Sequence, residues 1–372
     1  MAKLKAALIG CGGRGRTHGV GYQVSDRVDL VACADVNRST AELVAKDLGV
    51  SSVYEDYGEM LEKEKPDVVS VCLWTRLHYD AVMASVEARV KLINAEKPMA
   101  PTWGEARRMH EACEKAGVLM TFSHQTRYGP SFNKVREWVQ EGAMGDLIRI
   151  EGYTANMFDM GTHRFDRMFF YNNDQPVEWV IGQINCAEEH AVFDVPVETH
   201  GVSLVGWKNG VTGLLVTGLP NTLQDRLIGS DGIIENSTRT KVRMLRKGDS
   251  DWIVPKFQPV DLPGRETTLY IEDAITWLET GKESRTSSRK ALQATEVIFA
   301  TYESSRRRAR VELPLAIEDS PLLNMLESGE IVISDYPARL SKEEESDVYR
   351  PDQGRICAAS HRVRDRRTCP SR

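Results

Sequence analysis

The sequence contains no long apolar run and no excess of basic residues. None of its apolar runs approaches the roughly 18 residues of a membrane-spanning helix, and the amino terminus leads directly into a strand-like segment without a signal-peptide core. With 48 Lys and Arg against 54 Asp and Glu, the net charge is -6. The chain therefore lacks the basic surface that non-specific nucleic-acid binding requires. These absences predict a soluble, cytoplasmic protein with neither membrane nor nucleic-acid partners.

Paired or closely spaced cysteines are also absent. The seven cysteines are odd in number and form no Cys-x-x-Cys pair, so neither a disulfide framework nor a zinc site is expected, and no other metal site is predicted. The remaining composition, 41% hydrophobic and 27% charged, is ordinary for a globular protein. A length of 372 residues predicts two domains.

A glycine-rich turn follows the first apolar run. Residues 5–9 lead at once into Gly10-Cys11-Gly12-Gly13-Arg14-Gly15 and a predicted helix through Val24. In a G-x-G-x-x-G turn between strand and helix, a pyrophosphate can approach the backbone at the helix amino terminus. The second apolar run, 28–34, ends in Asp35, whose carboxylate would bind ribose hydroxyls and repel a 2′-phosphate. The turn therefore predicts NAD, while Arg38 could pair with a phosphate and leaves NADP open.

Apolar runs and amphipathic segments continue to alternate up to residue 122. We expect strands at 53–54, 68–73, 91–95 and 118–122, and helices at 39–48, 57–63 and 102–116. This alternation predicts a parallel, doubly wound sheet. The segment from Trp74 to His78 follows one of these strands, on the same edge as the glycine turn. Trp74 and Thr75 could flank a nicotinamide or merely cover the sheet, and His78 is expected to cap a helix rather than transfer a proton.

The run 91–95 ends abruptly in Glu96-Lys97-Pro98. Ligands of parallel sheets bind beyond the carboxyl ends of the strands, and proline disfavours a helix that runs straight on. We therefore expect Lys97 to point into the ligand crevice. A surface Glu-Lys pair before a helix would explain the same residues.

Two later segments carry further candidate residues. The polar stretch 123–130 is expected to cross between domains, where Arg127 could contact a substrate or tie the domains together. If a helix begins near Asp159, then Asp159 and His163 stand four residues apart on one face. A histidine oriented by a carboxylate suits a general base near neutral pH. A structural histidine with Asp159 as a helix cap is the alternative.

The rest of the chain is predicted to form an antiparallel sheet with helices. Asn209-Gly210 between apolar runs is a hairpin signal. A helix is expected at 131–141, and a strand at 147–153. Further strands are expected at 177–184, 199–207, 211–218, 226–228 and 232–235. Helices at 267–280 and 287–307 are expected to close the second domain.

In order and spacing, these motifs resemble those of the glucose–fructose oxidoreductase / inositol dehydrogenase / rhizopine catabolism (Gfo/Idh/MocA) family, over about residues 3–315. The motifs are Gly10-x-Gly12-x-x-Gly15, Glu96-Lys97-Pro98, Arg127-Tyr128 with Pro130, Gly142-x-x-Gly145 and Asp159-x-Gly161-x-His163-x-x-Asp166. The resemblance implies a Rossmann domain at 1–122 and an α/β domain with a large open, mostly antiparallel sheet at 123–316, used for substrate binding and for homo-dimers or homo-tetramers. Residues 317–372 form an extension, whose arginine-rich end, 351–372, is too polar to order itself.

The resemblance also implies roles for individual residues. Lys97 holds the substrate hydroxyl, His163 accepts its proton, Asp159 is the partner of His163 and a substrate contact, and the Lys97–Pro98 peptide bond is commonly cis. Arg127 and Tyr128 join these three as candidate substrate contacts. The candidate cofactor-binding residues lie along the expected strand ends: Gly10, Gly12, Gly13, Arg14, Gly15, Asp35, Arg38, Trp74, Thr75, His78, Glu96 and Lys97.

The chain departs from the family pattern in the segment before the Asp159 motif. Only Thr154–Phe158 intervenes, where relatives usually carry a longer segment, so a larger glycoside could fit. Arg164 and Arg167 beside the motif could serve an acidic sugar, although arginines at such helical positions are more often solvated or paired.

The leading hypothesis is an NAD-dependent oxidoreductase acting on a secondary hydroxyl of a sugar, polyol or related cyclic compound. The first alternative is a glycosidase that oxidises a sugar hydroxyl transiently, which would not accumulate NADH. The second is a non-catalytic NAD-binding regulator, against which the presence of Lys97, Asp159 and His163 argues.

Overall fold

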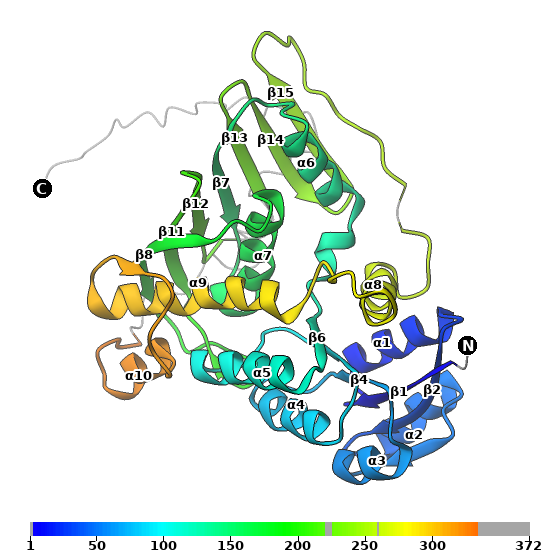
Figure 1. The fold of residues 1–372 in the computed structure, drawn as a ribbon. Helices are drawn as coiled ribbons and strands as arrows, with labels where there is room; N and C mark the ends of the chain where they lie inside the picture. Colours follow the sequence, from blue (N-terminus) through cyan, green and yellow to red (C-terminus); the bar gives the residue numbers. More distant parts are fainter. Residues whose placement is uncertain (1–2, 220–224, 259, 334–372) are drawn as a thin grey trace, which may run out of the picture. The chain divides into compact units, whose positions relative to one another are not determined.

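The computed structural model describes residues 3–219, 225–258 and 260–333 (Figure 1). The arginine-rich stretch 351–372 and most of the predicted extension lie outside the described residues.

The first sheet has six parallel strands in the order β3-β2-β1-β4-β5-β6. Its central strands β4 and β5 are buried along their whole length, which is why their sequences read as continuous apolar runs. The finding confirms the predicted doubly wound sheet. The strands are β1 (Leu4–Ile9), β2 (Val28–Ala34), β3 (Ser52–Tyr54), β4 (Val68–Val71), β5 (Leu92–Ala95) and β6 (Leu119–Phe122), and the helices between them are α1 (Gly13–Val24), α2 (Arg38–Leu48), α3 (Tyr57–Glu64), α4 (His78–Glu87) and α5 (Trp103–Ala116).

The second sheet has eight strands in the order β15-β14-β13-β7-β12-β11-β8-β16. Every neighbouring pair is antiparallel except β12 with β7, so the prediction of a mostly antiparallel sheet is confirmed. Strands β15 and β16 were not predicted. The strands are β7 (Leu147–Tyr153), β8 (Val177–Asn185), β11 (His200–Trp207), β12 (Thr212–Val216), β13 (Asp225–Gly229), β14 (Gly232–Thr238), β15 (Lys241–Arg246) and β16 (Val311–Glu312).

Three helices cover one face of this second sheet: α6 (Pro130–Gln140), α7 (Thr162–Tyr171) and α9 (Ser288–Arg307) (Figure 1). Alternate sheet residues such as Val180, Val205 and Leu215 point into the resulting core. The residues between them, among them Ile181 and Val202, are exposed on the opposite face. The period-two pattern of the strands therefore buries one face only.

Helix α8 (Glu266–Thr280) packs against α1 of the first sheet, rather than closing the second domain as predicted. Arg27, between α1 and β2, donates to the Glu272 carbonyl (2.9 Å), and the Tyr270 hydroxyl lies 2.9 Å from that of Thr121 in β6. The sequence of an amphipathic helix shows that one face is buried, but not which sheet buries it.

Among the described residues, no helix combines the length and the apolar character that crossing a bilayer demands. The last described helix is α10 (Pro321–Glu327).

Candidate functional site

A cavity of about 420 Å³ lies beyond the carboxyl ends of the first sheet's strands, next to the glycine turn. Gly10 has a φ of +92°, and a Cβ there would meet the Cys72 carbonyl oxygen at 2.5 Å, so only glycine is tolerated. A Cβ on Gly12 or Gly13 would meet nothing within 4 Å. The start of α1 therefore offers its backbone N–H groups to open space, as a pyrophosphate site requires. The residues fit a dinucleotide.

Acidic side chains surround this cavity. Asp35 directly follows β2, lines the cavity, and accepts hydrogen bonds from the backbone N–H groups of Cys11 (2.8 Å) and Asn37 (2.9 Å). Glu55 and Asp80 line the same cavity. Arg38 does not line it; its guanidinium contacts Glu42 at 2.8 Å and Glu55 at 3.5 Å. A 2′-phosphate here would face mainly carboxylates.

The segment after β4 divides its residues between the cavity and the protein interior. Trp74 lines the cavity and is 62% exposed, whereas Thr75 is buried and does not line it. His78 is buried at the start of α4, where Nδ1 lies 3.0 Å from the Pro98 carbonyl and Nε2 lies 3.0 Å from the Leu73 carbonyl. His78 thus joins two loops at the sheet edge and does not reach the cavity.

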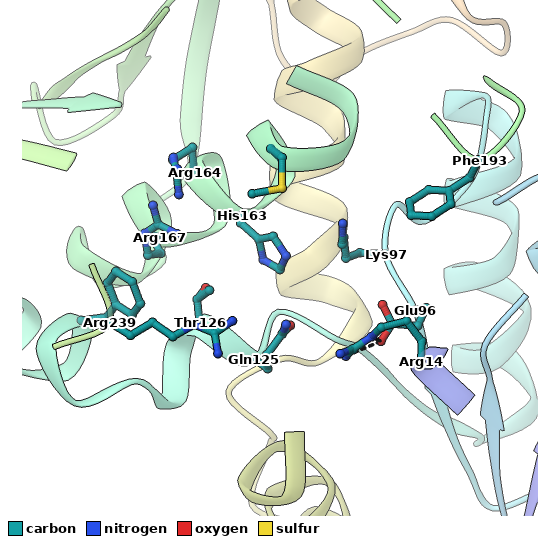
Figure 2. Close-up of a pocket in the computed structure, with 12 residues that line it drawn as sticks. Arg14, Glu96, Lys97, Gln125, Thr126, His163, Arg164, Arg167, Phe193 and Arg239 are labelled. Carbon is teal, nitrogen blue, oxygen red and sulfur yellow. Dashed lines mark hydrogen bonds and ion pairs between the residues drawn. The ribbon is translucent and has the colours of Figure 1, made fainter. Parts of the chain in front are cut away.

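A second cavity, of about 330 Å³, begins where β5 ends, and Figure 2 shows most of its lining. Glu96 and Lys97 enter it directly after β5, and the Lys97–Pro98 peptide bond is cis, as the resemblance implies. The lining residues come from segments far apart in the sequence: Arg14, Glu96, Lys97, Gln125, Thr126, Phe132, Met160, His163, Arg164, Arg167, Phe193 and Arg239.

Glu96 links the glycine turn to the loop after β5 that carries Lys97. Its Oε1 accepts hydrogen bonds from Arg14 Nε (2.8 Å), and it lies 3.0 Å from Nε2 of the buried His18. Burial alone would raise the pKa of Glu96, but the contacts with His18 and Arg14 outweigh it and lower that pKa to about 2. The carboxylate is therefore ionised. Its contacts with Arg14 and His18 hold Glu96 in place directly before Lys97.

Asp159 contacts Lys97, whose Nζ donates to its carboxylate. Asp159 lies within a π-helical turn, η3 (Met157–Gly161), where the Gly161 N–H donates to the Asn156 carbonyl (2.8 Å). The cap is Asn156, whose side chain accepts from the Asp159 N–H at 2.8 Å. Asp159 is therefore neither the cap nor a described hydrogen-bond partner of His163, because the π turn alters the spacing that an α-helix would give.

His163 lies in the first turn of α7, on the wall of the cavity. It is 6% exposed, and its Nδ1 has no hydrogen-bond partner among the described residues. Burial, followed by the positive charge of Lys97, lowers its pKa well below the ordinary value. The imidazole is therefore neutral at neutral pH and can accept a proton.

Arg127 and Tyr128 do not line the cavity, contrary to their prediction as substrate contacts. Arg127 is buried and forms ion pairs with Asp166 and Asp174, each at 2.9 Å. The Tyr128 hydroxyl donates to Asp273 (2.8 Å). Both act as internal ties, which is the alternative that the sequence left open for Arg127.

Several lining residues could not be identified from the sequence. Phe193 lies in the turn between β9 (Ala191–Val192) and β10 (Val195–Pro196), and its ring is 5.7 Å from Lys97 Nζ. Arg239 directly follows β14. Neither belongs to a motif, and only the fold brings them to Lys97. The remaining unpredicted lining residues are Gln125, Thr126, Phe132 and Met160.

Comparison with known proteins gives one family model and several relatives. Residues 4–124 match the oxidoreductase family with an NAD-binding Rossmann fold (GFO_IDH_MocA). The chain is 24% identical to the D-apiose dehydrogenase of Paraburkholderia graminis, over 89% of this chain and 95% of that protein. It is 34% identical to the D-glucoside 3-dehydrogenase of Escherichia coli, over 39% of this chain and 41% of that protein.

Solved structures share the fold. The WlbA dehydrogenase from Bordetella pertussis, crystallised with NADH and UDP-GlcNAcA, superposes with a TM-score of 0.70 at 22% identity. The match covers 85% of this chain and 100% of that one.

Proposed function

Because this chain belongs to the Gfo/Idh/MocA family of NAD-binding oxidoreductases, we propose that it transfers a hydride between nicotinamide and a secondary hydroxyl carbon of a sugar, polyol or related cyclic compound. The observation that carries the proposal is that Lys97 and the neutral His163 line the same cavity, together with Arg14 of the glycine turn. Relatives named for apiose and for glucosides support a carbohydrate substrate.

Residues of the first sheet would hold the cofactor. The backbone from Gly10 to the start of α1 would bind the pyrophosphate, and Asp35 the adenosine ribose. Trp74 would lie along the dinucleotide, since it lines the same cavity. The carboxylates of Asp35, Glu55 and Asp80 favour NAD over NADP. Bound NAD would supply the hydride acceptor.

The chain's own residues would accept the hydroxyl proton and stabilise the negative charge that develops on the hydroxyl oxygen. His163 would remove the hydroxyl proton, for which its unprotonated imidazole is suited. The Lys97 ammonium would donate to the same oxygen and stabilise the negative charge that develops there. Asp159 would hold Lys97 in place through their ion pair.

The testing experiment follows reduced nicotinamide by its near-ultraviolet absorbance while the protein is offered NAD or NADP with sugars, polyols, uronic acids and nitrophenyl glycosides. Accumulation of NADH with one substrate class supports the proposal. Release of nitrophenol without net NADH favours the alternative, a glycosidase that oxidises its substrate transiently. Binding of NAD without turnover of any compound favours a non-catalytic regulator.

The exposed face of the second sheet supports a further part of the proposal, that copies of the chain associate there. Ile181 and Val202 are 45% and 41% exposed on this face. In the ladder, Ile181 pairs with Leu204, and Val202 with Val216, so the apolar side chains are contiguous. Contiguous exposed apolar surface commonly marks a protein interface. We expect a homo-dimer or homo-tetramer.

A further inference from the structure

The turn between β9 and β10 holds two residues in a backbone conformation that side chains rarely adopt. Phe193 and Asp194 have φ values of +50° and +62°, and the flanking residues Val192 and Val195 pair across the turn. A two-residue hairpin turn with two positive φ values is usually built from asparagine, aspartate or glycine. A bulky residue in this conformation is an outlier, and such residues gather at functional sites. Chain reversal alone therefore does not explain a phenylalanine at this position.

The ring of Phe193 lies in the substrate cavity. It lines this cavity together with Lys97 and His163, and its centroid is 5.7 Å from Lys97 Nζ. Figure 2 shows Lys97 between His163 and this ring. The other phenylalanine among the described lining residues, Phe132, is fully buried and packs against Arg167, whereas Phe193 is 42% exposed. Of these two rings, Phe193 is the one with free surface for a ligand.

The hairpin that carries Phe193 is held at its base and at its tip. Val195 is buried in the core of the second sheet. At the tip, Arg76 Nε donates to the Asp194 carbonyl at 2.7 Å and lies 3.6 Å from the Asp194 carboxylate. Arg76 belongs to η1 (Thr75–Leu77), the short helix between β4 and α4. A residue of the first sheet's domain thus fixes the turn from outside, and the ring is held in position beside Lys97.

Building on the function proposed above, we propose that the substrate is a cyclic carbohydrate whose ring packs one apolar face against Phe193 while its reacting carbon lies at Lys97 and His163. The face of an aromatic ring carries partial negative charge and attracts C–H groups, which a pyranose or cyclitol ring presents together on one side. An open-chain polyol has no such face. The cavity of about 330 Å³ suits a single ring. Phe193 does not line the cofactor cavity, so its ring faces the substrate rather than the dinucleotide.

The test is calorimetric binding to the protein saturated with NADH, which cannot oxidise the compounds offered. Each ring is compared with an open chain of the same carbon number: glucose and myo-inositol with sorbitol, galactose with galactitol, and xylose with xylitol. We expect at least one ring to bind at least about tenfold more tightly than its open-chain counterpart, because only the ring can use the aromatic contact. Phe193→Tyr keeps the aromatic face and should keep this preference.

Phe193→Gly separates a role in binding from a role in folding. Glycine adopts a positive φ without strain, so the Tm should not fall. The affinity for the ring should drop at least about tenfold and approach that of the open chain. The matched control is Asp194→Gly, which changes the other positive-φ residue of the same turn, outside the cavity lining, and keeps the carbonyl contact with Arg76. This control should hold the ring's affinity within about twofold.

Equal affinity for rings and open chains, no binding of any ring, or a ring preference that survives Phe193→Gly would each overturn the proposal. A lower Tm in Phe193→Gly, or an equal loss of affinity in Asp194→Gly, would overturn it too, because the turn rather than the ring would then be responsible. Turnover is measured separately by NADH formation. Oxidation of rings and open chains alike would retain the oxidoreductase and reject the aromatic contact, whereas a Phe193-dependent ring preference without turnover would do the reverse.

Discussion

At the scale of single residues, the cavity combines a cation with a base that is kept unprotonated by its burial and by the charge of that cation. Burial, followed by the charge of Lys97, lowers the pKa of His163. Asp159 pairs with Lys97, and His163 has no carboxylate partner at Nδ1 among the described residues. An imidazole in this state accepts a substrate proton without first losing its own. The same ammonium group is placed to stabilise the resulting oxyanion.

Lys97→Ala should lower kcat by at least about a hundredfold, because loss of one donor to a developing oxyanion has that effect in other enzymes. NADH affinity, measured by fluorescence titration, should stay within about twofold, because the cavity beside the glycine turn is lined by other residues. Lys91→Ala is the control, since Lys91 forms an ion pair with Asp67 at the opposite end of β5. Strongly impaired NADH binding would refute the role given to Lys97.

The charge of Lys97 also predicts how His163 titrates. Lys97→Met removes a positive neighbour, so the pKa of His163 should rise toward its ordinary value, and Lys91→Met should leave it unchanged. Ring-carbon NMR titration of the unliganded protein measures this directly. In the native enzyme, the acid limb of sugar oxidation should lie well below pH 6.5, the ordinary value for histidine. A pKa of His163 that is the same with and without Lys97 would contradict this electrostatic account.

At the scale of elements, the π turn η3 positions Asp159, and a hydrogen bond to the buried Glu198 holds the turn in place. Glu198 is fully buried, accepts the Met157 N–H at the start of the turn, and accepts the Tyr302 hydroxyl at 2.6 Å. Burial raises the pKa of Glu198 to about 7, against the effect of these two donors. The carboxyl group therefore connects α9 to the turn that carries Asp159.

Glu198→Ala should lower kcat and destabilise the fold by about 3 kcal/mol, because two buried donors lose their acceptor. Glu198→Gln keeps an acceptor of the same shape and should restore most of both. The control is Glu303→Ala, which removes a buried carboxylate paired with Arg306 and Arg307 on α9. It should cost stability in chemical denaturation but leave kcat nearly unchanged. Equal losses of kcat in the two alanine variants would show that η3 is not held specifically by Glu198.

A site residue could be predicted where the neighbouring sequence alone determines its position in the fold. The glycine turn, Asp35 and Lys97 follow buried strands directly, so their place at the sheet edge follows from the apolar runs. The ion pair of Asp159 with Lys97 was not predictable, because the π turn has no sequence pattern comparable to helical periodicity. Phe193 and Arg239 enter the cavity from turns and strand ends whose position is set only by the complete second sheet.

At the scale of the whole molecule, the second sheet has one face covered by helices, and among the described residues Ile181 and Val202 are exposed on the other face. Val202→Arg places a charge on this exposed apolar face and should shift the protein to monomers, as measured by light scattering on a sizing column. Val254→Arg is the control, because Val254 is 65% exposed outside the strands of this sheet. If Val202→Arg left the molar mass unchanged, this face would not be the interface.

The balance of buried titratable groups predicts how the whole fold responds to acid. His18, His78 and His163 are buried, and burial lowers the pKa of each. Below about pH 6.5, the unfolded chain binds protons at these histidines that the native state does not, so the free energy of unfolding falls as pH falls.

Each histidine contributes a slope of up to about 1.4 kcal/mol per pH unit. Glu198 acts in the opposite direction, because its raised pKa of about 7 means that the native state binds a proton before the unfolded chain does. Burial also lowers the pKa of His110 and raises that of Glu296, so four histidines act against two carboxyl groups. Chemical denaturation at about pH 5.5 should therefore show lower stability than at about pH 7.5. His78→Asn should reduce this pH dependence, because it removes one of the four histidines. A free energy of unfolding that is constant or rises on acidification would contradict the predicted balance between these histidines and carboxyl groups.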